Sequence, residues 1–142
     1  MKVAIGSDHA GFELKAYIKQ KLEDQGVEVI NYGTDGPDSV DYPDFAHPVC
    51  EDVEQAKVDF GILICGTANG MTMTANKQQG IRCGLCWEPE IAALTKQHND
   101  ANIIALPARF ISLEKGWTIT QAYMDAEYEG GRHQRRVDKM MC

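Results

Sequence analysis

The stretch from Phe60 to Lys77 contains the residues whose types and spacing are most suited to chemistry. Cys65 follows an apolar run at residues 60–64 and precedes five small or turn-forming residues, Gly66, Thr67, Ala68, Asn69 and Gly70. Residues 71–77 then have a helical pattern. A strand, a small-residue loop and a helix in this order predict an anion site, because the first amides of a helix lack acceptors within it and the helix dipole adds positive charge there.

Cys65 has two interpretations. An electropositive backbone favours a thiolate, so the thiol is a candidate base or nucleophile beside amides that can hold an oxyanion. Thr67, in the same loop, is a second candidate catalytic residue. The alternative is that Cys65 is a small buried hydrophobe at the end of a strand, which is the commoner role for such a cysteine.

Two other segments offer polar side chains near the ends of predicted elements. Asp8 and His9 follow a short apolar strand, where they can bind sugar hydroxyls. We also expect Ser7 or Asp8 to cap the next helix, which leaves His9 unexplained. His98 and Asn99 end a predicted helix. The helix dipole favours a histidine at this end, and this alone would explain His98 about half the time.

The charges are distributed unevenly along the chain. The net charge is −7, which argues against a nucleic-acid partner. A basic group nevertheless lies in the last dozen residues and comprises Arg132, His133, Arg135, Arg136 and Lys139. This group is either a solvated helix end or part of a site for a small anion.

Composition is typical of a globular protein. The chain has 142 residues, 44% of them hydrophobic and 25% charged, so we expect a single domain over residues 1–142. No apolar run predicts a membrane partner and no signal peptide is evident, so a cytoplasmic location is expected. Of five cysteines, Cys83 and Cys86 have C-x-x-C spacing. They lie in a predicted strand without a second pair or a nearby histidine, so neither a metal nor a cofactor is expected.

Strands and helices alternate along the sequence. Strands are predicted at residues 2–6, 27–32, 60–64, 81–86 and 101–106, and helices at 11–25, 45–55, 71–77, 88–98, 113–128 and 132–141. This order predicts a five-stranded parallel sheet in a three-layer α/β/α sandwich, Rossmann-like in type. If the first and third strands are neighbours, the loops after them, together with the loop containing Arg109, meet at the carboxyl edge of the sheet, where such folds bind ligands.

With these residues assembled, the sequence resembles the ribose-5-phosphate isomerase B family, which includes galactose- and allose-phosphate isomerases. The similarity runs along the whole chain in five blocks: IGSDHAGFELK at 5–15, DYPDFA at 41–46, CGTANGMTMTANK at 65–77, GIRCGLCWEPEIAALTKQHND at 80–100 and GGRHQRRVDK at 130–139.

The resemblance implies a metal-independent aldose-ketose isomerase of the pentose phosphate pathway. It implies that Cys65 moves a proton through an enediolate held by the loop amides, and that His98 assists ring opening. Asp8, His9 and Asn99 would bind hydroxyls, and Arg109, Arg132 and Arg136 the phosphate of a small sugar. It also implies a homodimer, or a dimer of dimers, with sites shared between subunits.

The loop departs from the family pattern at two positions. Ala68 stands where relatives have glycine, which implies strain if the site needs a positive φ. Met71 stands where some relatives have a glutamate base. Methionine cannot act as a base, so of positions 65 and 71 only Cys65 is a candidate. The alternatives left open are a hexose-6-phosphate isomerase and a non-catalytic sugar-phosphate module. A nucleotide-binding domain is disfavoured because neither G-x-G-x-x-G nor a P-loop is present.

Overall fold

The structure, a computed structural model, describes residues 1–141. Its centre is a parallel sheet of five strands, β1 (Lys2–Ser7), β2 (Glu28–Asn31), β3 (Phe60–Cys65), β4 (Cys83–Leu85) and β5 (Ile103–Pro107). The strand order is β2-β1-β3-β5-β4, so β1 and β3 are neighbours, as the predicted crevice requires. The predicted fold class is therefore confirmed.

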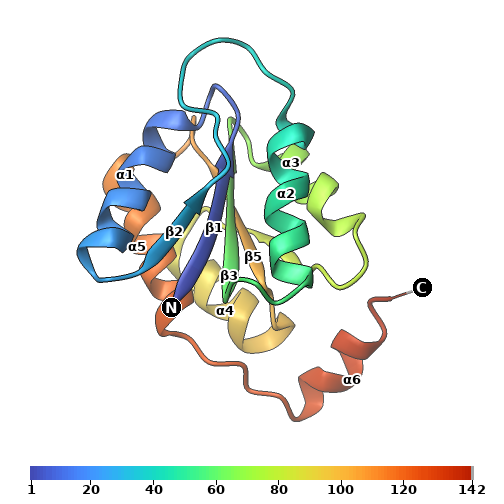
Figure 1. Cartoon of the computed structure of the whole chain (residues 1–142). Coiled ribbons are helices and arrows are strands. Elements are labelled where there is room, and N and C mark those ends of the chain that lie inside the picture. Colours follow the sequence, from blue (N-terminus) through green and yellow to red (C-terminus); the bar gives the residue numbers. More distant parts are fainter. Residues whose placement is uncertain (142) are drawn as a thin grey trace.

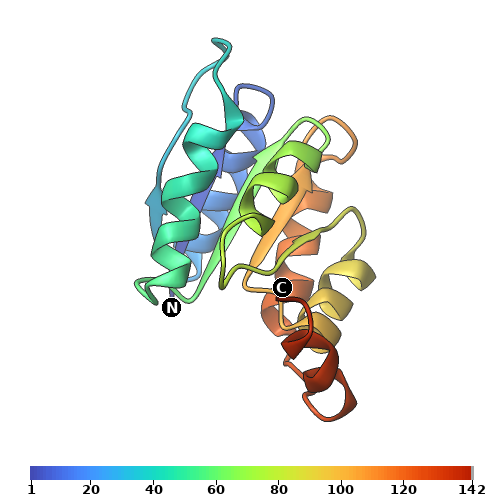
Figure 2. The same ribbon diagram turned by 90° about the vertical axis from the view of Figure 1, so that its right-hand side faces the viewer.

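Helices cover both faces of the sheet (Figures 1 and 2). The helices are α1 (Phe12–Asp24), α2 (Tyr42–Glu54), α3 (Asn69–Asn76), α4 (Pro89–Asn99), α5 (Leu113–Asp125) and α6 (Arg132–Asp138). Side chains alternate along the strands, so Ile62 and Ile64 pack in the core under α1, α4 and α5. Leu63 and Cys65 lie in the opposite core, with residues of α2 and α3.

Strand β3 is the most enclosed element of the sheet. All six of its residues are buried, because strands flank it on both sides and helices cover both of its faces. The apolar run at residues 60–64 therefore reflects a central strand, as the sequence predicted.

Two local predictions were wrong at helix starts. The N-cap of α1 is Gly11 and has no side-chain hydrogen bond, so neither Ser7 nor Asp8 caps that helix. Instead the Asp8 carboxylate accepts the Ala10 N–H in a turn between strand and helix. The second helix, predicted over residues 45–55, begins earlier, at Tyr42, because proline is tolerated in the first turn of a helix.

The two ends of the parallel sheet set the positions of the loops. Gly61 pairs with Ile103 where β3 and β5 begin, and Cys65 pairs with Pro107 where they end. Helix α6 lies beyond the opposite edge, where the strands begin, apart from the sandwich (Figures 1 and 2). None of the helices within residues 1–141 has the length and apolar character needed to cross a bilayer.

Candidate active site

The loop between β3 and α3 has the backbone of an anion site. Within residues 1–141, the N–H groups of Thr67, Ala68 and Gly70 have no protein acceptor, and the Asn69 N–H is bonded only to Thr67 Oγ1 at 3.2 Å. Ala68 is left-handed, with φ +66°, which confirms that this position requires a positive φ. The chain turns sharply here, so successive N–H groups are available to one small anion.

Cys65 is the last residue of β3 and adjoins this loop. Its side chain is 4% exposed and belongs to the core shared with Ala68 and Met71, on the face covered by α2 and α3. The thiol thus lies at the boundary between core and loop, in agreement with either interpretation of the sequence.

The other three described cysteines are unsuited to act as bases. Burial raises the pKa of Cys50 and of Cys86 to about 12, and it also raises that of Cys83. All three therefore stay protonated at neutral pH. Cys83 lies in β4, as predicted, but Cys86 directly follows the strand, which is shorter than the predicted strand at residues 81–86.

Asp8 and His9 lie beside the loop, as predicted. The Asp8 N–H donates to Ile64 O at 3.1 Å, which ties the end of β1 to the end of β3. His9 Nδ1 accepts the Val40 N–H at 3.2 Å, so the neutral ring has its proton on Nε2. His9 can therefore present an N–H donor to a ligand while residues 33–41 fix its ring.

A buried lysine holds that segment in place. Lys15, on α1, has a side chain that is 1% exposed, and its Nζ donates to Asn31 Oδ1 at 2.9 Å and to Asp35 Oδ1 at 2.6 Å. Asn31 Oδ1 also accepts the Gly33 N–H at 2.9 Å. Lys15 thus fixes the start of the segment whose far end, at Val40, holds His9.

Arg109 and Tyr42 approach the loop from two other elements. The Arg109 N–H donates to Gly66 O at 3.1 Å, and a Cβ at Gly66 would lie 3.1 Å from Arg109 Cδ, so this side chain crosses the loop. The Tyr42 ring packs on Gly70, where a Cβ would lie 2.5 Å from Cζ. Sequence reasoning missed Tyr42; its place in the DYPDFA block was the available signal.

The remaining predicted site residues lie at the opposite end of the sheet, where the strands begin. His98 and Asn99 end α4 immediately before β5 begins at Ile103, whereas Cys65 pairs with Pro107 at its end. Those four residue steps along β5 span about 13 Å. Arg132 and Arg136 are exposed on α6, beyond the same edge as His98. The chain therefore divides its candidate site residues into two groups that one copy does not bring together.

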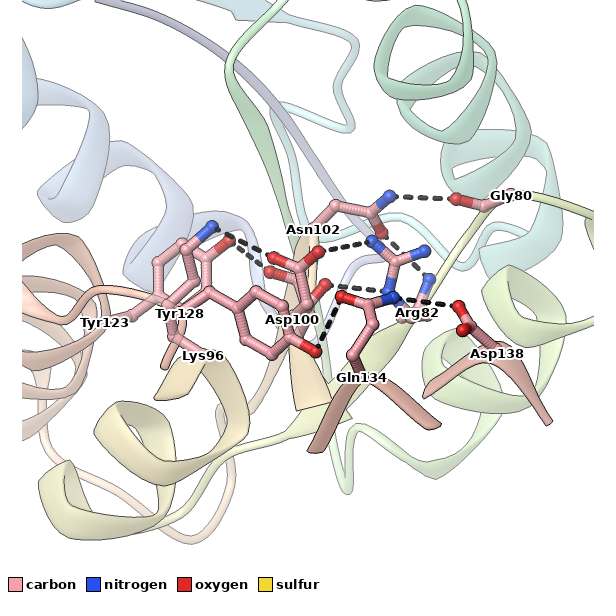
Figure 3. A network of polar contacts seen from close by, with 10 residues as sticks. Gly80, Arg82, Lys96, Asp100, Asn102, Tyr123, Tyr128, Gln134 and Asp138 are labelled. Carbon is pink, nitrogen blue, oxygen red and sulfur yellow. Dashed lines mark hydrogen bonds and ion pairs between the residues drawn. The ribbon is translucent and has the colours of Figure 1, made fainter. Parts of the chain in front are cut away.

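A polar network braces the end of α4 (Figure 3). Asp100, directly after Asn99, is left-handed with φ +48° and ends the helix. Arg82 Nε donates to Asp100 O at 2.8 Å and Arg82 Nη2 lies 3.3 Å from Asp100 Oδ2, while Asn102 Oδ1 accepts the Arg82 N–H at 2.8 Å. These bonds fix the turn that follows His98, which makes Arg82 a positioning residue that the sequence did not reveal.

The fold and the loop define an α/β protein with a candidate site for a small anionic ligand at the carboxyl edge of a parallel sheet. Comparison with known proteins is more specific. The model of the Ribose/Galactose Isomerase family matches residues 3–140, and the chain belongs to this family.

Individual relatives match over nearly the whole chain. Ribose-5-phosphate isomerase B of Escherichia coli is 48% identical over 137 residues, which cover 96% of this chain and 92% of that protein. The solved ribose-5-phosphate isomerase B of Clostridium thermocellum is 46% identical with a TM-score of 0.97, covering 99% and 95% of the two chains. That of Mycoplasma genitalium, solved with bound ribulose 5-phosphate, is 40% identical with a TM-score of 0.95, covering 99% and 93%.

Proposed function

We propose that this chain is an aldose-ketose isomerase that interconverts ribose 5-phosphate and ribulose 5-phosphate. The observation on which the proposal rests is the position of Cys65, at the end of a buried strand and beside a loop whose N–H groups lack acceptors. The Mycoplasma genitalium relative, 40% identical with ribulose 5-phosphate bound, supports the choice of substrate.

The reaction moves one proton between adjacent carbons. The Cys65 thiolate removes the proton from C2 of the open-chain aldose, and the electron pair of that C–H bond forms the C1–C2 double bond of an enediolate. The charge that develops on the C1 oxygen is held by N–H groups of residues 66–70, with the Thr67 hydroxyl close by. Return of the proton to C1 gives the ketose, as a proton passes from the C2 hydroxyl to the C1 oxygen.

The other side chains bind and open the sugar. Asp8, His9 and Asn99 are proposed to hold hydroxyls and the ring oxygen, and His98 to transfer the proton that opens the ring. The planar guanidinium groups of Arg109, Arg132 and Arg136 suit the phosphate.

We further propose a homodimer, or a pair of dimers, in which each active site combines the Cys65 group of one copy with the His98 group of another. The support is the separation of these groups at opposite edges of one sheet. Exposed Arg132 and Arg136 on α6 would then reach the anion loop of the neighbouring subunit. A cytoplasmic location belongs to the same proposal, since free thiols persist in reducing compartments.

Two single variants and their mixture test this arrangement. Cys65→Ala and His98→Gln should each abolish or strongly reduce interconversion of ribose 5-phosphate and ribulose 5-phosphate without loss of fold, as judged by circular dichroism. Unfolding and refolding the two variants together should restore about one quarter of wild-type activity, because half of the dimers are mixed and each mixed dimer has one intact site. Full activity in Cys65→Ala would refute its role, and a mixture without recovery would refute the shared site.

A hexose-6-phosphate isomerase is the second candidate, and the family description, which names galactose as well as ribose, favours keeping it. Turnover of five-carbon and six-carbon aldose phosphates at equal concentration would separate the two. A binder without catalysis would leave the C2 proton of bound substrate unexchanged in deuterated water.

A further inference from the structure

We propose that His98, Glu129 and His133 form a binding site for a transition-metal ion such as Zn²⁺. The three residues come from the end of α4, the connection between α5 and α6, and the first turn of α6. Each offers one ligand atom, and these atoms all lie within 4.8 Å of one another. His98 Nε2 is 3.7 Å from Glu129 Oε1, and the two imidazole rings stack with centroids 4.3 Å apart.

Backbone geometry brings these side chains together. The Glu129 N–H donates to Gln97 O at 3.0 Å, which fixes the connection against the end of α4. The next two residues, Gly130 and Gly131, have φ +64° and +52°, a conformation that reverses the chain so that His133 returns toward Glu129.

A side-chain bond closes the same turn. Tyr128 Oη donates to Gln134 Oε1 at 3.1 Å (Figure 3). In the sequence, Tyr128 directly precedes Glu129 and Gln134 directly follows His133. The cluster is therefore held by contacts that do not involve the metal-ligating atoms themselves.

Two imidazoles and a carboxylate are a donor set that zinc uses when a fourth position stays open to water or ligand. With bonds of about 2.0 to 2.2 Å, tetrahedral geometry requires ligand atoms roughly 3.3 Å apart. The side chains must therefore close by about 1.5 Å at most, and the His133 ring must turn out of the stack, because a metal lies in the plane of each imidazole that binds it. Both movements are open to side chains that are only partly buried.

The local charges favour a metal that binds nitrogen. Arg132 and Arg136 lie on α6 together with His133. The same arginines repel cations, which disfavours Mg²⁺ and Ca²⁺ and leaves a preference for ions with affinity for imidazole.

Occupation of this site would inhibit the enzyme. This consequence rests on the proposed function, in which His98 transfers the proton that opens the sugar ring. A metal bound to the His98 nitrogen takes the lone pair that this transfer needs. The ion is thus an inhibitor that competes for a catalytic side chain, and isomerisation itself proceeds without it.

Titration calorimetry of the chelator-treated full chain with ZnCl₂ tests the site directly. We expect one ion per chain, and an affinity at least about tenfold lower in Glu129→Gln and in His133→Gln, since each loses one of three ligands. His47→Gln is the matched control, because His47 lies on α2 outside the cluster, and its affinity should equal that of the wild type. Substitution by Co²⁺ should give visible bands without thiolate charge transfer, which separates this site from binding at Cys65.

Inhibition is measured on the same proteins, each relative to its own activity without zinc. Zinc should inhibit the wild type and His47→Gln, and Glu129→Gln and His133→Gln should resist it. Absence of zinc binding in the wild type, unchanged affinity in both ligand variants, or a thiolate band with Co²⁺ would each overturn the site. If the chain proved not to be an isomerase, the calorimetry would still decide the site, so failure of the two proposals can be told apart.

Discussion

Lys15 allows a quantitative test of how the segment at residues 33–41 is held in place. Its Nζ is buried and bonded to Asn31 and to Asp35, which is 71% exposed. A hydrogen bond to a charged group contributes about 1.5 to 3 kcal/mol, but exposure of Asp35 screens the pair and burial of the ammonium offsets part of the gain. Lys15→Met keeps most of the length of the side chain and removes the charge, so we expect a loss of about 1 to 2 kcal/mol in the free energy of unfolding.

Lys15→Ala separates packing from charge. It also removes about three buried methylene groups at roughly 0.8 kcal/mol each, so the total loss should be about 3.5 to 4.5 kcal/mol. Urea unfolding of both variants, of Asp35→Ala and of the Lys15→Met/Asp35→Ala double variant gives a double-mutant cycle, in which we expect a coupling of about 1 kcal/mol.

The same variants should affect substrate binding. Residues 33–41 reach from the Lys15 contact to Val40, which holds His9, so a looser segment should raise KM more than it lowers kcat. A Lys15→Met protein as stable as wild type, or a coupling below about 0.3 kcal/mol, would refute the reasoning that this ion pair holds the segment.

Three further predictions concern Gly70, Arg82 and Asp35. Gly70→Ala places a Cβ 2.5 Å from the Tyr42 ring, so steady-state assays should give a large loss of kcat/KM, whereas Gly36→Ala, with nothing within 4 Å, should behave as wild type. Arg82→Met removes the bonds that fix the turn after His98, so kcat should fall while phosphate affinity, measured with inorganic phosphate, stays near the wild-type value. The Lys15 hydrogen bond lowers the pKa of Asp35 below its ordinary 3.8, so the native state binds that proton less tightly than the unfolded chain. The stability advantage of the wild type over Asp35→Asn should therefore be constant above about pH 5 and decline as the pH falls below about 4, which urea unfolding across this range would measure.

The fold could be predicted because strands and helices alternate with distinct periods. The run at residues 60–64 predicted a strand buried on both faces, and β3 is one. The short loop between β3 and α3 could also be predicted, since a run of small residues separates the strand pattern from the helix pattern. Ala68 was expected to be strained if its φ is positive, and that φ is +66°.

Features that depend on contacts distant in sequence could not be predicted. Lys15 resembles any lysine of an amphipathic helix, and only the fold places its Nζ against Asn31 and Asp35. His98 and His133 come together only through the reversal at Gly130 and Gly131, and no local motif marks them as neighbours. Helix starts also differed from prediction, as at Tyr42, because first-turn proline permits either a turn or a helix.

The division of candidate residues between opposite ends of β5 has a consequence for behaviour on dilution. Under the proposed arrangement, a dissociated subunit keeps its whole fold yet contains only half of the groups that act on the sugar. Turnover per chain should then follow the fraction of associated chains, and a substrate that touches both subunits should hold them together by mass action.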